Sequence, residues 1–198
     1  MRPRTIRTPH GPARVHLHGA EDPAAVLVLG HGAGGGIAAP DLAGVAAAAV
    51  ARAISVVLVE QPYRVAGRRS PAPAAQLDAA WTAVVEQLDF PGLPLYTGGR
   101  SSGARVACRT AEATGAAAVL CLAFPVHPPG RPEKSRLDEL DSVKVPVLVV
   151  QGDHDPFGMP PKRRGRKLLV VEGDHSLRKG VPAYAEAAAE WLVSLHAT

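Results

Sequence analysis

Short apolar runs alternate along the chain with longer stretches in which apolar residues recur every three or four positions. The runs predict strands at 26–29, 54–59, 93–97, 118–123, 145–151 and 167–171. The longer stretches predict helices at 41–53, 71–88, 102–114 and 182–196. The β-branched run 54–59 is typical of a strand buried on both faces, and 14–18 is a candidate antiparallel strand at one edge. The repeated strand-then-helix order predicts the α/β class, with a mostly parallel sheet and helices on both faces.

A chain of 198 residues is long enough for one well-packed core, so we expect one domain over 1–198, with 1–12 as a flexible segment. Ligands of parallel sheets bind at the carboxyl ends of the strands. The loops that follow the predicted strands are 30–39, 60–70, 98–103, 124–136, 152–166 and 172–180.

Composition narrows the function classes. With 46% hydrophobic and 20% charged residues, intrinsic disorder is excluded for most of the chain. The net charge of +4 comes from scattered residues, so we expect no nucleic-acid partner. No apolar run reaches the roughly 18 residues of a membrane span, and no secretory signal is visible. Cys108 and Cys121 lie in apolar surroundings and are interpreted as reduced core residues, which favours the cytoplasm.

The clearest candidate for chemistry is the GxSxG pattern Gly99-Arg100-Ser101-Ser102-Gly103. It lies between a predicted strand and a predicted helix, the setting in which such a serine is exposed on a sharp turn. The helix N-terminus there favours a developing anion. We therefore predict Ser101 as a nucleophile.

A serine nucleophile needs a histidine base and an orienting carboxylate. His175 follows the last predicted strand, and Asp153 and Asp155 both follow the strand before it. The order Ser, Asp, His along the chain is the order of α/β-hydrolases. The residues alone leave both Asp153 and Asp155 as candidates for the orienting carboxylate, whereas Asp174 is interpreted as solvated or structural.

An oxyanion in this setting is bound by backbone N–H groups. We expect one donor from Ser102 and the other from the glycine-rich loop 31–36, at Ala33 with Gly34 in reserve. His31 is interpreted as a brace for that loop.

These motifs resemble those of small, lidless α/β-hydrolases related to dienelactone-hydrolase-like enzymes. The resemblance is strongest to the α/β-hydrolase-like family that includes the testis-expressed Tex-type proteins and the third subunit of the NSL acetyltransferase complex. The segments that carry it are GHGAGGG at 30–36, GGRSSGAR at 98–105, FPVHPPGRPEKSR at 124–136, QGDHDPFG at 151–158 and DHSL at 174–177. The resemblance implies an α/β-hydrolase fold without a cap domain, and Asp155 rather than Asp153 as the acid. Dienelactone-hydrolase relatives carry a cysteine where this chain has Ser101.

Residues in the loops of the predicted active edge are candidates for substrate binding. Arg64, Arg100 and Arg131 could each neutralise a substrate anion or serve as ion-paired surface residues. His127 is expected to shape the pocket wall. The five basic residues in 162–167 are interpreted as a solvated loop, with a polyanion contact as the alternative.

Two other site types compete. Gly30-x-Gly32-x-x-Gly35 fits a dinucleotide motif, with Glu60 as its acid, but residues 37–40 separate it from the next helix. A metal site could be imagined from Asp153, His154, Asp155 and His175, although their spacing matches no established ligand pattern.

The sequence therefore predicts a serine hydrolase with Ser101, Asp155 and His175 as a triad, most simply a carboxylesterase-type acyl hydrolase on a small or extended ester. No cofactor or metal is expected, and the oligomeric state is left open. The alternative is a non-catalytic interaction or scaffold protein that keeps the hydrolase fold.

Overall fold

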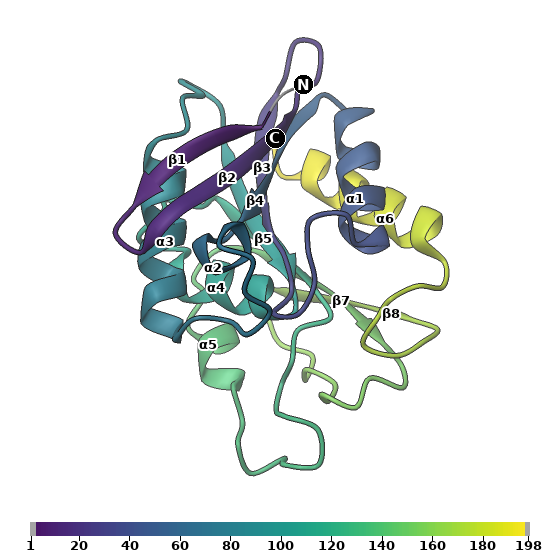
Figure 1. Ribbon diagram of the computed structural model, residues 1–198. Helices are drawn as coiled ribbons and strands as arrows, with labels where there is room; N and C mark the ends of the chain where they lie inside the picture. The colour runs from purple at the N-terminus through teal and green to yellow at the C-terminus, as the bar shows by residue number, and fades with distance from the viewer. Residues whose placement is uncertain (1–2, 197–198) are drawn as a thin grey trace.

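The computed structural model describes residues 3–196, which form one eight-stranded sheet between two layers of helices (Figure 1). The strands are β1 (Arg4–Thr8), β2 (Gly11–His18), β3 (Ala25–Gly30), β4 (Ile54–Glu60), β5 (Leu95–Arg100), β6 (Ala118–Leu122), β7 (Val147–Gly152) and β8 (Arg166–Val171). Their spatial order is β1-β2-β4-β3-β5-β6-β7-β8. Strands β3 to β8 pair in parallel, whereas β1 and β2 are antiparallel. The predicted fold class is confirmed.

The helices divide between the two faces of the sheet. They are α1 (Pro40–Val50), α2 (Pro62–Val65), α3 (Ala74–Glu86), α4 (Ser102–Thr110), α5 (Leu137–Asp141) and α6 (Val181–Ser194). Helices α1 and α6 pack together on one face, and α3, α4 and α5 cover the other (Figure 1). In the central strands successive side chains therefore enter opposite cores, which is why these strands are mostly apolar on both faces.

The amino-terminal segment differs from the expectation. Residues 4–8 and 11–12, expected to be flexible, belong to a hairpin that adds two strands to the sheet. Ile6, Ala13 and Val15 are buried beneath α3, while the intervening residues face outward. This apolar face consists of three residues only, and the residues around it are arginines, prolines and histidines. The sequence therefore shows no clear apolar alternation that would have predicted β1. The candidate strand 14–18 is confirmed as the second half of β2.

The observed strands and helices begin later than predicted where a proline intervenes. The strand predicted from residue 93 begins after Pro94, and the strand predicted from residue 145 begins after Pro146. Helix α3 begins after Pro73 rather than at residue 71, since a proline disfavours helical backbone at the residue before it. Helices α2 and α5 are one turn long and have no periodicity to detect.

The two cysteines lie between α4 and β6. Cys108 and Cys121 are both free and buried, with their sulfurs 3.5 Å apart. The hydrogen bond to Cys121, together with burial, raises the pKa of the Cys108 thiol well above its usual value. Within residues 3–196, no helix combines the length and the apolar character that crossing a membrane requires.

Candidate active site

Ser101 occupies a strained turn between β5 and α4. Its φ of 52° and ψ of −108° are unusual for a residue with a side chain. The turn is possible because Gly99 and Gly103 have no side chains: a Cβ on either would lie within 2.5 Å of the Gly30 carbonyl oxygen at the end of β3. The close approach of β3 thus explains both glycines of the motif and holds the hydroxyl above the sheet.

His175 joins the serine to a carboxylate. Its Nε2 lies 2.9 Å from Ser101 Oγ, and its Nδ1 lies 2.8 Å from Asp155 Oδ2. A carboxylate can only accept, so Nδ1 carries the proton and Nε2 is free to accept the serine proton. The three residues come from the loops after β5, β7 and β8, whose carboxyl ends share one edge of the sheet.

The Asp155 side chain is 1% exposed and is held by two donors besides His175. The Phe157 N–H donates to Oδ1 at 2.8 Å, and Gln151 Nε2 donates to Oδ2 at 2.8 Å. Gln151 Nε2 also lies 3.1 Å from the Phe124 carbonyl oxygen and 2.9 Å from the Gly158 carbonyl oxygen, so its two hydrogens are shared among three acceptors. Sequence reasoning missed Gln151, although a polar residue ending the apolar run 145–151 was the available signal.

The other acidic candidates have separate partners. Asp153 accepts from the Gly173 N–H at 2.9 Å and lies 2.7 Å from His154 Nδ1, and the backbone hydrogen bond lowers the pKa of its carboxyl. Asp174 accepts from the Ser176 N–H within its own turn. Of the candidate acids, only Asp155 therefore contacts His175.

Two further residues pack against the base and its acid. The Phe157 ring stacks on the His175 imidazole, with ring centroids 4.0 Å apart and planes at 27°. The His127 N–H donates to the Phe157 carbonyl, and His127 Nδ1 donates to the Pro128 carbonyl. A Cβ at Gly158 would lie 2.6 Å from His127 Nε2, so His127 forms a wall beside the acid loop.

The loop after β3 also approaches the serine, because a Cβ at Gly32 would lie 3.7 Å from Ser101 Cβ. Within the described part of the chain, the N–H groups of Ala33 and Ser102 have no partner. The Tyr63 hydroxyl donates to the Ala33 carbonyl at 2.7 Å, a contact that the sequence did not reveal because α2 is so short. Gly34 is exposed, and a Cβ there would meet nothing within 4 Å.

His31 braces this loop, as predicted. Its Nε2 accepts the Gln61 N–H at 3.1 Å, so Nδ1 bears the proton that it donates to the Gly32 carbonyl at 2.8 Å. Burial lowers the pKa of His31, which is consistent with a neutral ring. The arrangement ties the loop after β3 to the loop after β4.

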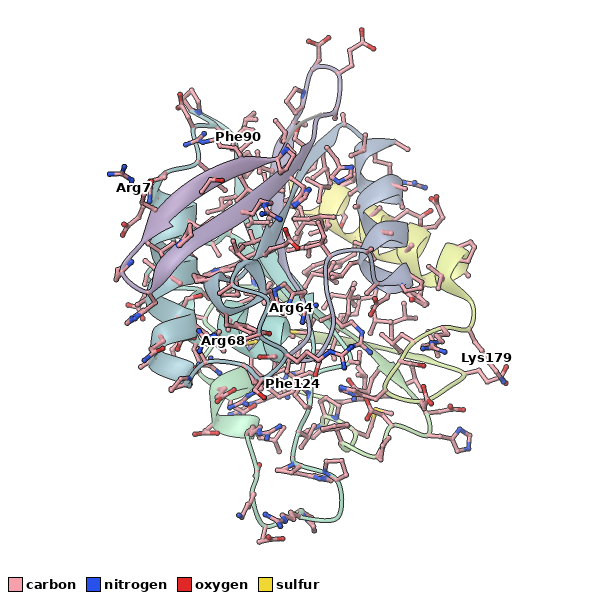
Figure 2. The ribbon with its side chains drawn as sticks, viewed as in Figure 1. Arg7, Arg64, Arg68, Phe90, Phe124 and Lys179 are labelled. Atoms are coloured by element: carbon pink, nitrogen blue, oxygen red, sulfur yellow. The ribbon has the colours of Figure 1, made fainter. Side chains whose placement is uncertain are left out.

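The three candidate arginines have different surroundings. Arg64 lies on α2 (Figure 2), and its one side-chain hydrogen bond within residues 3–196 is to the Arg68 carbonyl, at 3.3 Å. Arg131 is exposed, in the loop after β6. Arg100 instead directs its guanidinium toward Asp41 and the His175 carbonyl, so its donors are engaged within the protein.

Comparison with known proteins assigns the family. A family model described as an alpha/beta hydrolase domain matches residues 23–190. The chain belongs to the alpha/beta hydrolase family. No curated protein matches it.

Solved structures of other alpha/beta hydrolases share the fold. Est1E from Butyrivibrio proteoclasticus aligns over 99% of both chains at 17% identity with a TM-score of 0.79. XC6422 from Xanthomonas campestris, described as a serine hydrolase without a lid, aligns over 98% of this chain and 93% of its own at 22% identity, with a TM-score of 0.78. Dienelactone hydrolase from Anabaena variabilis aligns over 98% and 99% at 16% identity, with a TM-score of 0.75. At these identities the likeness concerns the fold alone.

The basic run 162–167 of this hydrolase is partly engaged in ion pairs within the chain. In the basic run 162–167, Arg163 and Arg166 both pair with Asp141, and the Arg166 side chain is only 4% exposed. This pairing weakens the polyanion interpretation.

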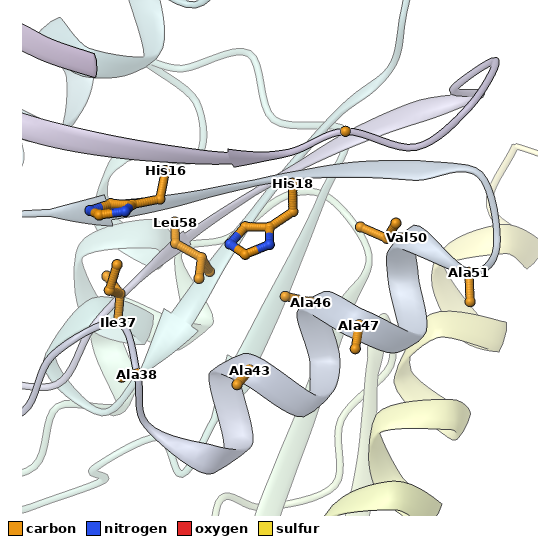
Figure 3. Close-up of a pocket in the computed structure, with 11 residues that line it drawn as sticks. His16, His18, Ile37, Ala38, Ala43, Ala46, Ala47, Val50, Ala51 and Leu58 are labelled. Carbon is orange, nitrogen blue, oxygen red and sulfur yellow. The ribbon is translucent and has the colours of Figure 1, made fainter. Parts of the chain in front are cut away.

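A cavity of about 800 Å³ lies between β2 and α1; His16 and His18 line it, and His18 points toward the alanines of the helix (Figure 3). It does not include Ser101. The catalytic candidates thus lie outside this cavity.

The structure also bears on the two competing site types. Glu60, the acid of the dinucleotide motif, is engaged by Arg14 and His16, and nine residues separate β3 from α1. In residues 3–196 no three His, Cys, Asp or Glu side chains cluster closely enough to hold a metal ion.

Proposed function

We propose that this alpha/beta hydrolase is a serine hydrolase in which Ser101, His175 and Asp155 act as the catalytic triad. The observation that carries the proposal is the continuous path from Ser101 Oγ to His175 Nε2 at 2.9 Å and from Nδ1 to Asp155 Oδ2 at 2.8 Å. It is supported by the strained turn at Ser101, which has the form of a nucleophile elbow.

The first half of the reaction follows from these contacts. Nε2 of His175 takes the hydroxyl proton of Ser101 as Oγ attacks the acyl carbonyl. The N–H groups of Ala33 and Ser102 stabilise the resulting oxyanion. When the tetrahedral intermediate collapses, the bond to the leaving group breaks, and the imidazolium returns its proton to that group. The acyl group remains on Oγ as an ester.

Water completes the cycle. His175 takes one proton from the water, whose oxygen attacks the acyl carbonyl. The second tetrahedral intermediate releases the carboxylic acid and returns the proton to Ser101 Oγ. Asp155 keeps the proton on Nδ1 throughout and stabilises the imidazolium.

We propose a carboxylic ester, small or extended, as the substrate. The absence of a cap among the described residues supports a substrate that is not enclosed. Gly34 and His127 would line its path, and Arg64 and Arg131 would attract an anionic group on it. Similar solved structures include Est1E with ferulic acid bound and a thioesterase domain from the curacin biosynthetic pathway. Feruloyl esters and thioesters should therefore be tested as substrates beside simple carboxylic esters.

The role of the two arginines has its own test. In Arg64→Gln and Arg131→Gln, kcat/KM for anionic esters should fall several-fold more than for neutral esters of the same size. An equal loss on both ester types would exclude charge recognition.

The finer family assignment, to the Tex-type and NSL-subunit group, and a cytoplasmic location remain part of this proposal. The two free buried thiols support a reducing compartment.

Covalent labelling tests the proposal directly. Intact-protein mass after treatment with a fluorophosphonate should show one adduct on the native chain, none on Ser101→Ala, and one on the control Ser142→Ala. A folded native protein that takes no adduct would instead support the scaffold alternative.

A further inference from the structure

Arg100 forms an ion pair with Asp41, and its side chain is 19% exposed. It is the last residue of β5, directly before Ser101. Its guanidinium contacts three other segments of the chain.

The three contacts come from separate loops. Nε lies 2.8 Å from Asp41 Oδ2, and Nη2 donates to the His175 carbonyl at 2.9 Å. A Cβ at Gly32 would lie 2.9 Å from Nη1, so the backbone that leads to Ala33 rests against the guanidinium. One side chain thereby touches the first turn of α1, the loop of the base and the loop of the proposed oxyanion donor.

Asp41 is the fixed end of this arrangement. Its side chain is 0% exposed and accepts the Leu42 N–H at 2.9 Å, which anchors it in the first turn of α1. Burial raises the pKa of the Asp41 carboxyl, and the charge of Arg100 counteracts that shift. Leaving the buried Asp41 carboxylate without its cation would be strongly unfavourable, so Asp41 holds the Arg100 guanidinium at this position.

The loop of His175 has a second anchor on the same side. The Tyr184 hydroxyl of α6 donates to the Leu177 carbonyl at 2.7 Å. Arg100, the residue before Ser101, adds a hydrogen bond from its side chain to the His175 carbonyl of this loop. The Ser101 and His175 backbones are thus linked through one guanidinium.

We infer that Arg100, held by Asp41, is a positioning residue that sets the separation between Ser101 and His175 and supports the loop of Ala33. This inference rests on the proposed serine hydrolase function. A misplacement of about 1 Å between reacting groups can lower a rate about 100-fold, so a link of this kind has a measurable kinetic effect. The guanidinium suits the task because its fixed fork can reach two acceptors at once, which a lysine ammonium on a flexible stem does not do.

The test compares Arg100→Gln with Arg109→Gln. Arg109 is a matched control because its side chain is 18% exposed and is also ion-paired, to Asp78 and Glu139, but on the last turn of α4. With p-nitrophenyl butyrate we expect kcat to fall about 100-fold in Arg100→Gln and less than about threefold in Arg109→Gln, with KM nearly unchanged in both. Equal kcat in the two variants would overturn the inference.

Arg100→Lys decides the question if Arg100→Gln does not fold. Lysine keeps a cation near Asp41 but not the fork, so a folded Arg100→Lys protein should lose at least tenfold in kcat. Full activity in that variant would mean that Arg100 serves stability alone.

A second readout is independent of turnover and separates failure of this inference from failure of the proposed function. The proton between His175 Nδ1 and Asp155 should give a downfield NMR signal in the native chain and in Arg109→Gln. We expect the Arg100 variants to lose or shift it. A native protein that takes no fluorophosphonate would refute the proposed function, whereas an unchanged signal in folded Arg100 variants would refute the positioning role.

Discussion

Replacing Asp155 by asparagine removes the charge and turns one oxygen into an NH2 group. Three donors converge on the native carboxylate, from the Phe157 N–H, Gln151 Nε2 and His175 Nδ1, each at 2.8 Å. The asparagine amide has only one acceptor oxygen, so it cannot accept from both the Phe157 N–H and His175 Nδ1. With its oxygen toward Phe157, the NH2 group faces the imidazole, and Nε2 takes the proton and cannot accept that of Ser101. With its oxygen toward His175, the imidazolium that forms during the reaction has no carboxylate.

Both orientations are therefore costly. In a serine protease the corresponding change lowers kcat about 10⁴-fold, equivalent to about 5 kcal/mol of transition-state stabilisation. Either orientation also leaves a buried donor without an acceptor, at about 1–3 kcal/mol. For a chain of 198 residues, each kcal/mol lowers Tm by about 2–4 °C. We expect kcat to fall about 10³- to 10⁴-fold and Tm to fall by roughly 2–12 °C.

The assay is steady-state hydrolysis of p-nitrophenyl butyrate at about 20 °C, well below the expected unfolding transition of a mesophilic domain, with Tm measured on the same samples. Asp153→Asn is the matched control, because Asp153 lies two residues away, is exposed and contacts Gly173 and His154 instead. It should change kcat less than about threefold, as expected of a surface substitution. The reasoning is refuted if Asp155→Asn retains more than about a tenth of native kcat, or if the control loses as much.

Three further outcomes are expected. Phe157→Leu removes the aromatic face from the imidazolium formed in the reaction, a loss of about 0.5–1 kcal/mol, so kcat should fall about two- to fivefold in the same assay, and no change would exclude that contact as a contributor. Burial lowers the pKa of His31 below the unfolded value of 6.5, so the unfolded state binds more protons and stability should fall as pH drops through that value. Urea unfolding of His31→Asn should show a shallower pH dependence, and an identical slope would contradict this. Gly103→Ala places a Cβ 2.3 Å from the Gly30 carbonyl oxygen and should cost about 1–3 kcal/mol or more, whereas Gly34→Ala, with open space around it, should change the free energy of unfolding by less than about 0.5 kcal/mol.

Local chemistry along the chain determines much of this protein by itself. Apolar runs such as 54–59 predicted buried parallel strands, and the strand-then-helix order predicted the α/β class. The pattern around Ser101 also predicted the sharp turn there, because the glycines that let β3 come close are part of the motif. The positions of Ser101 and His175 in loops after strands predicted that they meet at one edge of the sheet, while the residues alone left Asp153 and Asp155 as alternatives for the acid.

Tertiary structure decided what depends on contacts between distant segments. Nothing local distinguishes a substrate-binding arginine from Arg100, whose partners are Asp41 and a carbonyl 75 residues away. Gln151 and Tyr63 orient the acid and the loop after β3 through single hydrogen bonds, which leave no periodic signal. The edge strand β1 depends on Ile6 meeting a core built by α3, and that core exists only in the folded chain. Sequence periodicity reports which face of an element is apolar, whereas the partner that meets a polar side chain is set by the packing of the whole molecule.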